Sequence, residues 1–417
     1  MRAGQKIVYS GALMLVSPIL VLVQGLKSND RQYRRWMLTL FATVYASTFS
    51  IEGIGDGTRH WQPVYDYYAD LSFSQFLADL TDILSFRTNP NTNEDVYIHV
   101  LSYFTGGLLG LPGLFFTFVG FIYGYFFAGS MVKVFRYFPS PRQHFPYFII
   151  AVYFIAILNL QSMNTVRTWT GFWVLFYATL QYHDTRRFKY LLLLFTAPLF
   201  HLGYFVMALP VWAVIFLPVK KYWIMIMYLA SFSFSFITPQ FAVSQLEKTE
   251  VGQSKIDGYY VEEKATIEGK FQGYRSRRWY LQYQKSGLMG WAVVGIALVF
   301  LLNGDYLKRM NSLESLLFSA GLASKILSNT TWFLFALSNR SGAIADLFLL
   351  AAVVLYWQRH YIAGYRISMH PLLRPFLYAA VLLIVPGFFY YLSNTLEYLS
   401  AYILFLPEVA WFSEDLR

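Results

Sequence analysis

The sequence predicts an all-α, polytopic integral membrane protein with about 11 to 13 transmembrane helices. Of its 417 residues, 56% are hydrophobic and only 13% are charged, whereas a soluble domain carries roughly 25% charged residues. Aromatic residues make up 20% of the chain, and Tyr and Trp are suited to the boundary between membrane and water. Because such a chain cannot cover its surface with polar groups, lipid is expected to be its main solvent.

A membrane span requires about 20 mostly apolar residues, and the apolar stretches define the predicted helices, two of which, 188–199 and 201–217, are short. They lie near residues 7–25, 36–51, 111–131, 145–162, 169–182, 188–199, 201–217, 222–241, 286–303, 312–336, 342–357 and 375–393. The pair 188–199 and 201–217 also fits two half-spans that meet at His201. Residues 94–109 are expected to form a short helix that dips into the membrane. Residues 396–412 fit either a last span or an interfacial segment.

The orientation is predicted from the basic residues of the short loops. The formal net charge is +10, and Lys and Arg gather in alternate loops, from Lys27, Arg31, Arg34 and Arg35 to Arg359, Arg366 and Arg374. We place these loops in the cytoplasm by the positive-inside rule. The basic balance is thereby explained by topology, so nucleic acid is not an expected partner.

Two long segments, 52–93 and 242–285, then fall on the outer side of a single membrane domain covering 1–417. In the first, apolar residues recur at helical spacing, with Asp79 and Asp82 on other faces. This pattern predicts an amphipathic helix that lies on the membrane surface. The apolar residues are Phe73, Phe76, Leu77, Leu80, Ile83 and Leu84. The first apolar stretch lacks a small-residue cleavage site, so no cleavable signal peptide is expected.

Arginines that break the positive-inside trend are the main candidates for a binding site. They are Arg59, Arg167, Arg275, Arg277, Arg278 and Arg340. A guanidinium binds phosphate through paired donors and keeps its charge at every relevant pH. Each arginine alone also fits an anchor at lipid headgroups or a partner for a nearby carboxylate. As a set on one side, they favour a phosphate site, with Arg167 and Arg340 in short outer turns next to the bilayer.

Candidate acid–base groups lie on the same predicted side. His201 stands between two apolar stretches, where an imidazole can act as a general base toward a hydroxyl; a hydrogen-bonded core histidine is the alternative. Asp56 and Asp66 are rival bases, although Asp66 and Asp70, four residues apart, also fit one solvated helix face. His60 and His99 are weaker candidates. Cysteine is absent, as are phosphate-loop and HExxH motifs, so no metal or cofactor is expected.

Four segments resemble the Wzy-type polysaccharide polymerases, in particular the EpsG-like branch. They are EDVYIHVLSYFTG at 94–106, MNTVRTWTG at 163–171, LFTAPLFHLGYFVMALP at 194–210 and LSNRSGAIADLFLL at 337–350. Their order and spacing are also similar to the family, over roughly residues 50–360. The chain departs from the family pattern at Thr168, at Gly203 and in the Arg-Ser-Gly at 340–342.

The resemblance implies a fold similar to the polyprenol-dependent membrane glycosyltransferases (GT-C-like) and a polymerase at the periplasmic face of the bacterial inner membrane. Such an enzyme moves a growing glycan from undecaprenyl diphosphate to the non-reducing end of the next lipid-linked repeat unit. It needs no metal, and the family suggests a chain-length regulator as a partner. Arg167 and Arg340 would stabilise the diphosphate, with Arg275, Arg277 and Arg278 assisting, and His201 would accept the hydroxyl proton.

Two rival functions remain. An O-antigen ligase-like transferase would share the arginine and histidine chemistry but use another acceptor. A transporter or flippase for lipid-linked oligosaccharide would be expected to show repeated bundles and a polar path through the membrane. No internal repeat is evident, and the polar groups concentrate on one side, so the polymerase is the favoured interpretation.

Overall fold

The computed structural model describes residues 3–49, 56–87, 95–135, 145–236, 288–362 and 369–397, and these form helices and turns without a strand. Four helical segments are long and apolar enough to cross a membrane: Pro112–Val134, Phe145–Thr165, Ala336–His360 and Leu373–Ser393. Shorter apolar helices cover Pro18–Lys27, Phe188–Phe200, Tyr204–Phe216 and Met289–Leu302. The described part is therefore that of an all-α membrane protein, and each predicted apolar stretch contains a helix.

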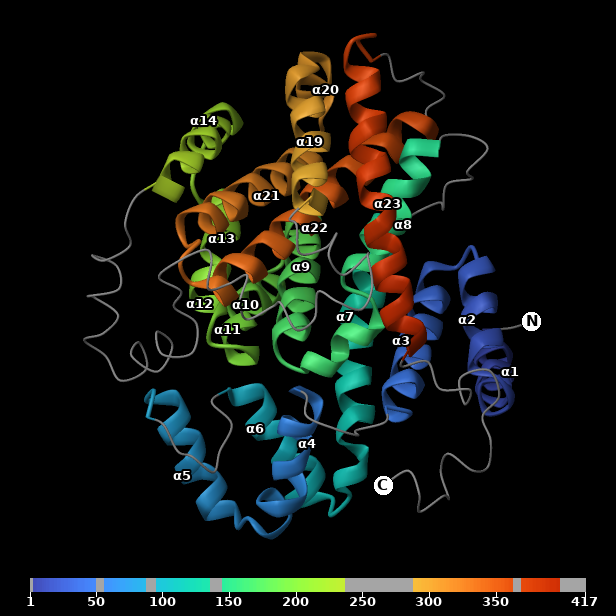
Figure 1. The fold of residues 1–417 in the computed structure, drawn as a ribbon. Helices are drawn as coiled ribbons and strands as arrows, with labels where there is room; N and C mark the ends of the chain where they lie inside the picture. The colour runs from blue at the N-terminus through green and yellow to red at the C-terminus, as the bar shows by residue number, and fades with distance from the viewer. Residues whose placement is uncertain are drawn as a thin grey trace. The chain divides into compact units, whose positions relative to one another are not determined.

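Backbone contacts group the chain into two compact units, which are described separately (Figure 1). Unit 1 takes residues 1–136, 158–204 and 394–417, and unit 2 takes 137–157 and 205–393. The helices of unit 1 are α1 (Ala3–Val16), α2 (Pro18–Lys27), α3 (Arg31–Ser47), α4 (Asp56–Asp66), α5 (Phe73–Leu84), α6 (Val96–Ser102), α7 (Phe115–Val134), α9 (Thr168–Thr185), α10 (Phe188–Phe195) and α11 (Ala197–Phe200). Figure 1 shows α4, α5 and α6 grouped at one end of this unit.

Small residues bring α3 and α7 into close contact in unit 1. A Cβ at Gly120 would lie 2.5 Å from the Ala46 side chain, and one at Gly124 would lie 2.6 Å from the Ala42 side chain. Without a hydrophobic driving force in lipid, helices associate through this kind of close backbone packing. Larger residues at these glycines would push the two helices apart.

Unit 2 is built around the antiparallel pair α21 (Ser312–Thr330) and α22 (Phe335–Ile362). Its other helices are α8 (Phe145–Ile157), α13 (Leu209–Phe216), α14 (Lys221–Ser231), α19 (Leu288–Leu302), α20 (Gly304–Arg309) and α23 (Leu373–Glu397), and the short α12 (Tyr204–Met207) lies at the boundary of the units. Glu314 is buried in the first turn of α21, where it forms a capping box with the N-cap residue Asn311. Its carboxylate oxygens also accept hydrogen bonds from Arg359 at 2.8 Å. This ion pair ties the first turn of α21 to the last turn of α22.

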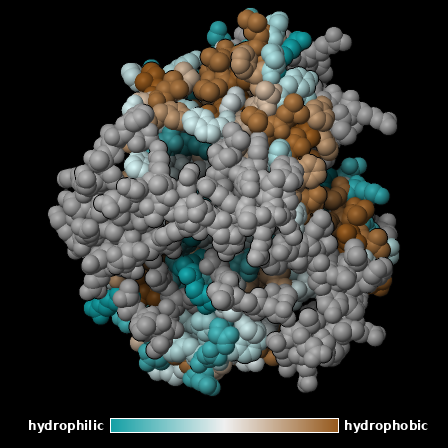
Figure 2. Space-filling model, viewed as in Figure 1, coloured by the Kyte–Doolittle hydropathy of each residue, from teal (hydrophilic) through white to brown (hydrophobic). Residues whose placement is uncertain are grey.

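Apolar side chains reach the surface of both units, as a membrane protein requires. Figure 2 shows brown surface over α2 in unit 1 and over α14 and α23 in unit 2. The exposed residues there include Leu20, Trp223 and Phe376. In water such surface would be costly, whereas lipid chains cover it without penalty.

Residues 56–87, the described part of the predicted loop 52–93, contain the α-helices α4 and α5. The helix expected at 73–84 is α5, but Asp79 is buried with Phe76 and Ile83 and accepts from Tyr67 at 2.6 Å and from Gln75 at 3.0 Å. Phe73, Leu77 and Leu84 are exposed instead, so contact of this stripe with a membrane surface stays a prediction.

The shared helix face expected for Asp66 and Asp70 was wrong. Helix α4 ends at Asp66, and Asp70 lies in a separate 3-10 turn, Tyr68–Asp70. The chain leaves helical geometry at Tyr67, whose φ is −123°, so the four-residue spacing no longer places the two carboxylates one above the other.

The outer turn expected around Arg340 was also misplaced. The turn occupies residues 331–334, and Arg340 lies in the second turn of α22. Ser338, Asn339, Ser341 and Gly342 suggested a loop because they are weak helix formers. The packing of α22 on α21 overrides that preference.

Candidate functional site

A buried carboxylate, Asp95, stands at the centre of a polar cluster in unit 1. Asp95 precedes α6 at the N-cap position, yet its side chain makes no bond to the N–H groups of its own helix. It contacts Arg167 and His201 instead and accepts from the backbone N–H of Leu202 at 2.7 Å. Only 1% of the Asp95 side chain is exposed. An acid that could cap its helix is therefore used to join three segments of the chain.

Arg167 enters this cluster from the start of α9. Its Nη1 donates to Asp95 Oδ2, and 12% of its side chain is exposed. The preceding residue, Val166, has φ of 50°, a region that a β-branched residue rarely adopts and that stores strain. Thr170 bonds back to the Val166 carbonyl and holds this bend. The strained bend fixes the direction in which Arg167 leaves the backbone.

His201 enters from a break between two short apolar helices. Helix α11 ends at Phe200, His201 itself is extended, and the next helix begins at Tyr204. Of the two alternatives for 188–217, the helix break at His201 agrees with the one in which two shorter helices meet there. His201 Nδ1 lies 3.5 Å from Asp95 Oδ1. Because a carboxylate beside Nδ1 favours the proton on that nitrogen, Nε2 is the nitrogen left to act as a base.

Packing around the break holds α9, α6 and α11 in register. The Tyr204 hydroxyl donates to the Thr168 carbonyl at 2.6 Å, and the Tyr97 and Phe200 rings lie 4.6 Å apart. A Cβ at Gly171 would meet the Tyr204 ring at 2.7 Å. Glycine at 171 therefore allows the segment that carries His201 to lie directly against α9.

The electrostatics of the cluster keep Asp95 ionised. Burial raises the pKa of a carboxyl, but the contact with His201 and the charge of Arg167 outweigh it and lower the pKa of Asp95 to about 2. The carboxylate therefore remains charged at every physiological pH. Asp95 is one anion facing an arginine and a histidine, and it uses one of the five guanidinium donors of Arg167. The other donors can bind a further anion.

The structure gathers only some of the residues predicted from the sequence. Arg167 and His201 come together, whereas Arg340 lies in α22 of unit 2. Asp56 begins α4 and Asp66 ends it, exposed and accepting from Gln62 at 2.9 Å. Arg59 is exposed and His60 buried on the same helix. Arg275, Arg277 and Arg278 lie outside the described residues, as does the loop 242–285.

His99, a weaker candidate, has a structural role. It is fully buried, its Nδ1 lies 2.8 Å from the Tyr68 hydroxyl, and its Nε2 lies 3.1 Å from the Phe76 carbonyl. The Phe76 ring stacks on it at 4.8 Å. Burial lowers the pKa of His99, and these partners fit a neutral ring that donates through Nε2. His99 therefore fastens α6 to α5.

Asp95 is the functional candidate that sequence reasoning missed. In the sequence it is one acid among several in and just after the segment 52–93. The signal that could have found it is its position in the sequence, directly before an apolar helix in a chain with few acids near its spans. A carboxylate at such a position must be paired with a cation or exposed to water. The sequence places its partners 72 and 106 residues away, so the pairing itself required the fold.

Comparisons of this chain with protein-family models, with curated proteins and with solved structures found no match.

Proposed function

We propose that the chain is a polysaccharide polymerase that joins lipid-linked repeat units, with Asp95, Arg167 and His201 as the core of its active site. The observation that supports it best is the Asp95 carboxylate holding both an arginine and a histidine at a break in the helices. In this proposal the donor is a glycan on undecaprenyl diphosphate, the acceptor is the next lipid-linked unit, and the site faces the periplasm of a bacterial inner membrane.

Arg167 suits the leaving group of this reaction. The bond between the anomeric carbon and the phosphate oxygen breaks, and the diphosphate leaves with the bonding electron pair. Arg167 is held by Asp95 and adjoins the N-terminus of α9, where helix N–H groups also favour an anion. Preorganised positive charge of this kind stabilises developing negative charge most effectively in a partly dry site.

His201 suits the other half of the same step. The acceptor hydroxyl forms the new bond to the anomeric carbon, and its proton passes to His201 Nε2. Asp95, 3.5 Å from Nδ1, then stabilises the resulting imidazolium. Arg340 and the arginines at 275, 277 and 278 remain proposed as further diphosphate ligands, and a chain-length regulator remains a proposed partner.

A transporter of lipid-linked oligosaccharide is a second candidate, because unit 2 holds an ion pair inside apolar helices. Lys325 Nζ on α21 lies 2.7 Å from Asp346 Oδ1 on the apolar span of α22, and both side chains are largely buried. Ionisable residues at such positions often mark a path for polar groups. A polymerase does not require this pair, so its removal separates the two candidates.

The test is a reconstituted reaction. The purified protein in nanodiscs is mixed with the lipid-linked repeat unit that the products of its neighbouring genes make. The mixture contains chelator and no nucleotide, and the products are separated by size. The proposal predicts a ladder that Arg167→Ala abolishes and that Arg187→Ala, an exposed arginine outside the cluster, leaves intact. A single transfer of the glycan to an acceptor other than the next repeat unit would instead indicate a ligase. No ladder, with movement of the unit between vesicle leaflets that Lys325→Ala stops, would indicate the transporter.

A further inference from the structure

A cavity of about 310 Å³ lies at the end of unit 1 opposite Asp95. Helix α9 separates the two places, since Arg167 precedes its first residue and the cavity residue Gln181 lies in its last turns. A helix of 18 residues is about 27 Å long at 1.5 Å per residue, close to the roughly 30 Å of a bilayer's hydrocarbon core. The cavity therefore belongs at the other membrane surface.

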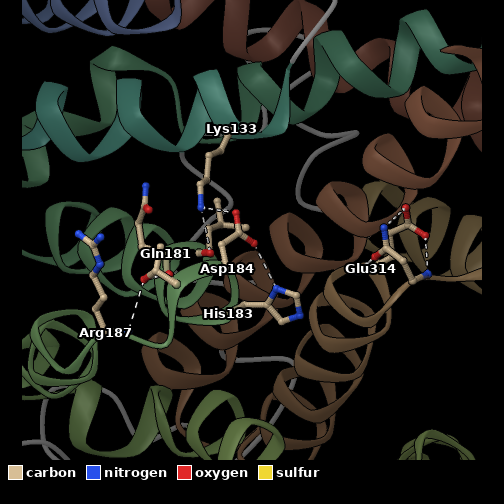
Figure 3. Close-up of polar contacts among 9 residues, drawn as sticks. Lys133, Gln181, His183, Asp184, Arg187 and Glu314 are labelled. Atoms are coloured by element: carbon tan, nitrogen blue, oxygen red, sulfur yellow. Dashed lines mark hydrogen bonds and ion pairs between the residues drawn. The ribbon is translucent and has the colours of Figure 1, made fainter.

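Basic and aromatic side chains dominate the lining of this cavity. Helix α3 contributes Arg31, Arg35 and Trp36, and α7 contributes Tyr125 and Lys133. None of the residues that line it is acidic. Two acids lie beside lining residues. Asp30 precedes Arg31 and caps α3 by accepting from the N–H groups of Gln32 and Tyr33. Asp184 binds Lys133 Nζ at 2.6 Å, while that ammonium also donates to the Leu180 carbonyl at 3.1 Å (Figure 3). Lys133 is thus neutralised, and the two arginines leave an excess of positive charge.

Arg35 is the group that most needs an anion. Its guanidinium carbon lies 3.9 Å from the centre of the Tyr125 ring and 5.0 Å from that of Tyr177. Its Nε and Nη2 atoms are buried and have no hydrogen-bond partner in the described part of the chain. Ring stacking holds the guanidinium plane but leaves Nε and Nη2 without an acceptor. Buried donors without partners are costly, so this edge is prepared for an acceptor.

Glycine at position 129 makes this arrangement possible. A Cβ there would lie 2.7 Å from the Tyr177 ring and 3.1 Å from Arg35 Nε. Any side chain at 129 would therefore displace the stack or occupy the place of an acceptor at Nε. The lining is built around the guanidinium rather than merely near it.

The surroundings favour a lipid headgroup over a soluble anion. Trp36 is partly exposed beside the cavity, its ring 6.1 Å from that of Tyr125, and exposed Phe121 lies one turn further along α7 toward the membrane interior. Amphipathic rings of this kind sit at headgroup depth, and Phe121 continues the apolar surface on which an acyl chain can lie. The basic loops at this end of unit 1 place it on the cytoplasmic side by the positive-inside rule.

We infer that this cavity binds the phosphate of an anionic membrane lipid, with the free edge of Arg35 as its main ligand and Arg31 as a second cation. The guanidinium fork donates hydrogen bonds to two phosphate oxygens, and the lipid tails follow Trp36 and Phe121 along α7. This site is separate from the proposed active site, and it stands whether or not the chain is a polymerase.

The experiment counts bound lipids on the delipidated full chain by native mass spectrometry. Phosphatidylglycerol is titrated in detergent against wild type, Arg35→Gln and Arg187→Gln, with phosphatidylcholine as the zwitterionic comparison. Losing a charge-assisted bidentate contact should weaken the tightest phosphatidylglycerol site by about tenfold or more in Arg35→Gln. Arg187→Gln removes a basic residue at the same end but outside the cavity, and should leave that site unchanged.

Two further measurements identify the source of the anion and keep the test valid if one variant fails to fold. Inorganic phosphate that displaces the lipid at low millimolar concentration would show a soluble-anion site and overturn the lipid assignment. Arg31→Gln changes an exposed residue and should weaken binding less than Arg35→Gln; Arg35→Lys should fall between them because it keeps charge without the fork. Equal phosphatidylglycerol affinity in wild type and in every cavity variant, or equal binding of phosphatidylcholine, would contradict the inference.

Discussion

Two ion pairs at opposite ends of α9 join the same kinds of groups in different surroundings. At the N-terminal end, Asp95 and Arg167 are 1% and 12% exposed. At the C-terminal end, Asp184 and Lys133 are 43% and 25% exposed (Figure 3). Each acid also holds a histidine, His201 in the first case and His183 in the second. Residue type and pairing are therefore nearly equal, and burial is the main difference.

The difference shows what each pair can do. Water screens the Lys133–Asp184 pair, so it contributes little to the fold. The Asp95–Arg167 pair has lost its hydration and persists because each charge needs the other. A group held in that way keeps a fixed position when a substrate arrives, which is the property a site for a developing charge requires.

The largest effect is expected from Asp95→Ala. This change leaves the Arg167 charge largely buried without its partner, and breaking a buried pair costs about 3–5 kcal/mol. Thermal unfolding in detergent should show a much lower midpoint, whereas Asp66→Ala, which removes an exposed carboxylate, should leave it nearly unchanged. The double variant Asp95→Ala with Arg167→Ala should recover part of the loss. No recovery would mean that the pair does not act as a unit.

The pH dependence of stability should follow from the same carboxylate. The pKa of Asp95 is lowered from 3.8 to about 2, so its pairing stabilises the fold above about pH 4 and that stabilisation is lost as the pH falls toward 2. At 1.36 kcal/mol per pKa unit the loss amounts to about 2 kcal/mol. Unfolding measured from pH 6 to pH 2 should show it in wild type. Asp95→Asn should lack this component, and an identical pH profile in that variant would contradict the assignment.

The two bends that flank α9 predict smaller effects. Val166 (φ 50°, ψ −65°) lies outside the left-handed region, whereas Arg186 (φ 53°, ψ 19°) lies within it at the C-cap. Val166→Gly should therefore stabilise the fold by about 1 kcal/mol, and Arg186→Gly by only a few tenths. Denaturation of the two variants side by side measures this. Val166→Gly should also slow any reaction that depends on Arg167, because it frees the direction of that side chain.

The smallest effect is expected from Asp184→Ala. The pKa of Asp184 is lowered, since burial, which raises it, is outweighed by Lys133 and His183. After allowance for solvent screening the pair is worth about 0–1 kcal/mol. The unfolding midpoint should hardly move. A loss as large as that of Asp95→Ala would show that burial does not separate the two pairs.

The helices were predictable from the sequence because their signal is local. Apolar stretches of spanning length require no knowledge of partners, and the shortness of 188–199 and 201–217 made a break at His201 one of two alternatives. The prediction of a turn at Arg340 was wrong because the packing of α22 on α21 outweighs the low helix propensity of the residues around Arg340.

The candidate site was only half predictable, because its centre depends on contacts between distant residues. Arg167 and His201 stood out as polar residues beside apolar stretches. Asp95 did not, because a carboxylate before a helix is ordinarily a cap, and nothing local shows that it turns away toward Arg167 and Leu202. Arg35 was likewise counted as one basic residue of an inner loop, since stacking on Tyr125 is not visible in the sequence.

The most direct test of the proposed active site is the size distribution of products from the reconstituted reaction with His201→Ala, Asp95→Asn and wild type. The variants should first be shown to fold by their elution as single species. We expect a ladder from wild type, none from His201→Ala, and a strongly shortened one from Asp95→Asn, in which Arg167 and His201 remain but lose the charge that orients them. Ladders of equal length and yield in all three would contradict the assignment of this cluster as the catalytic centre.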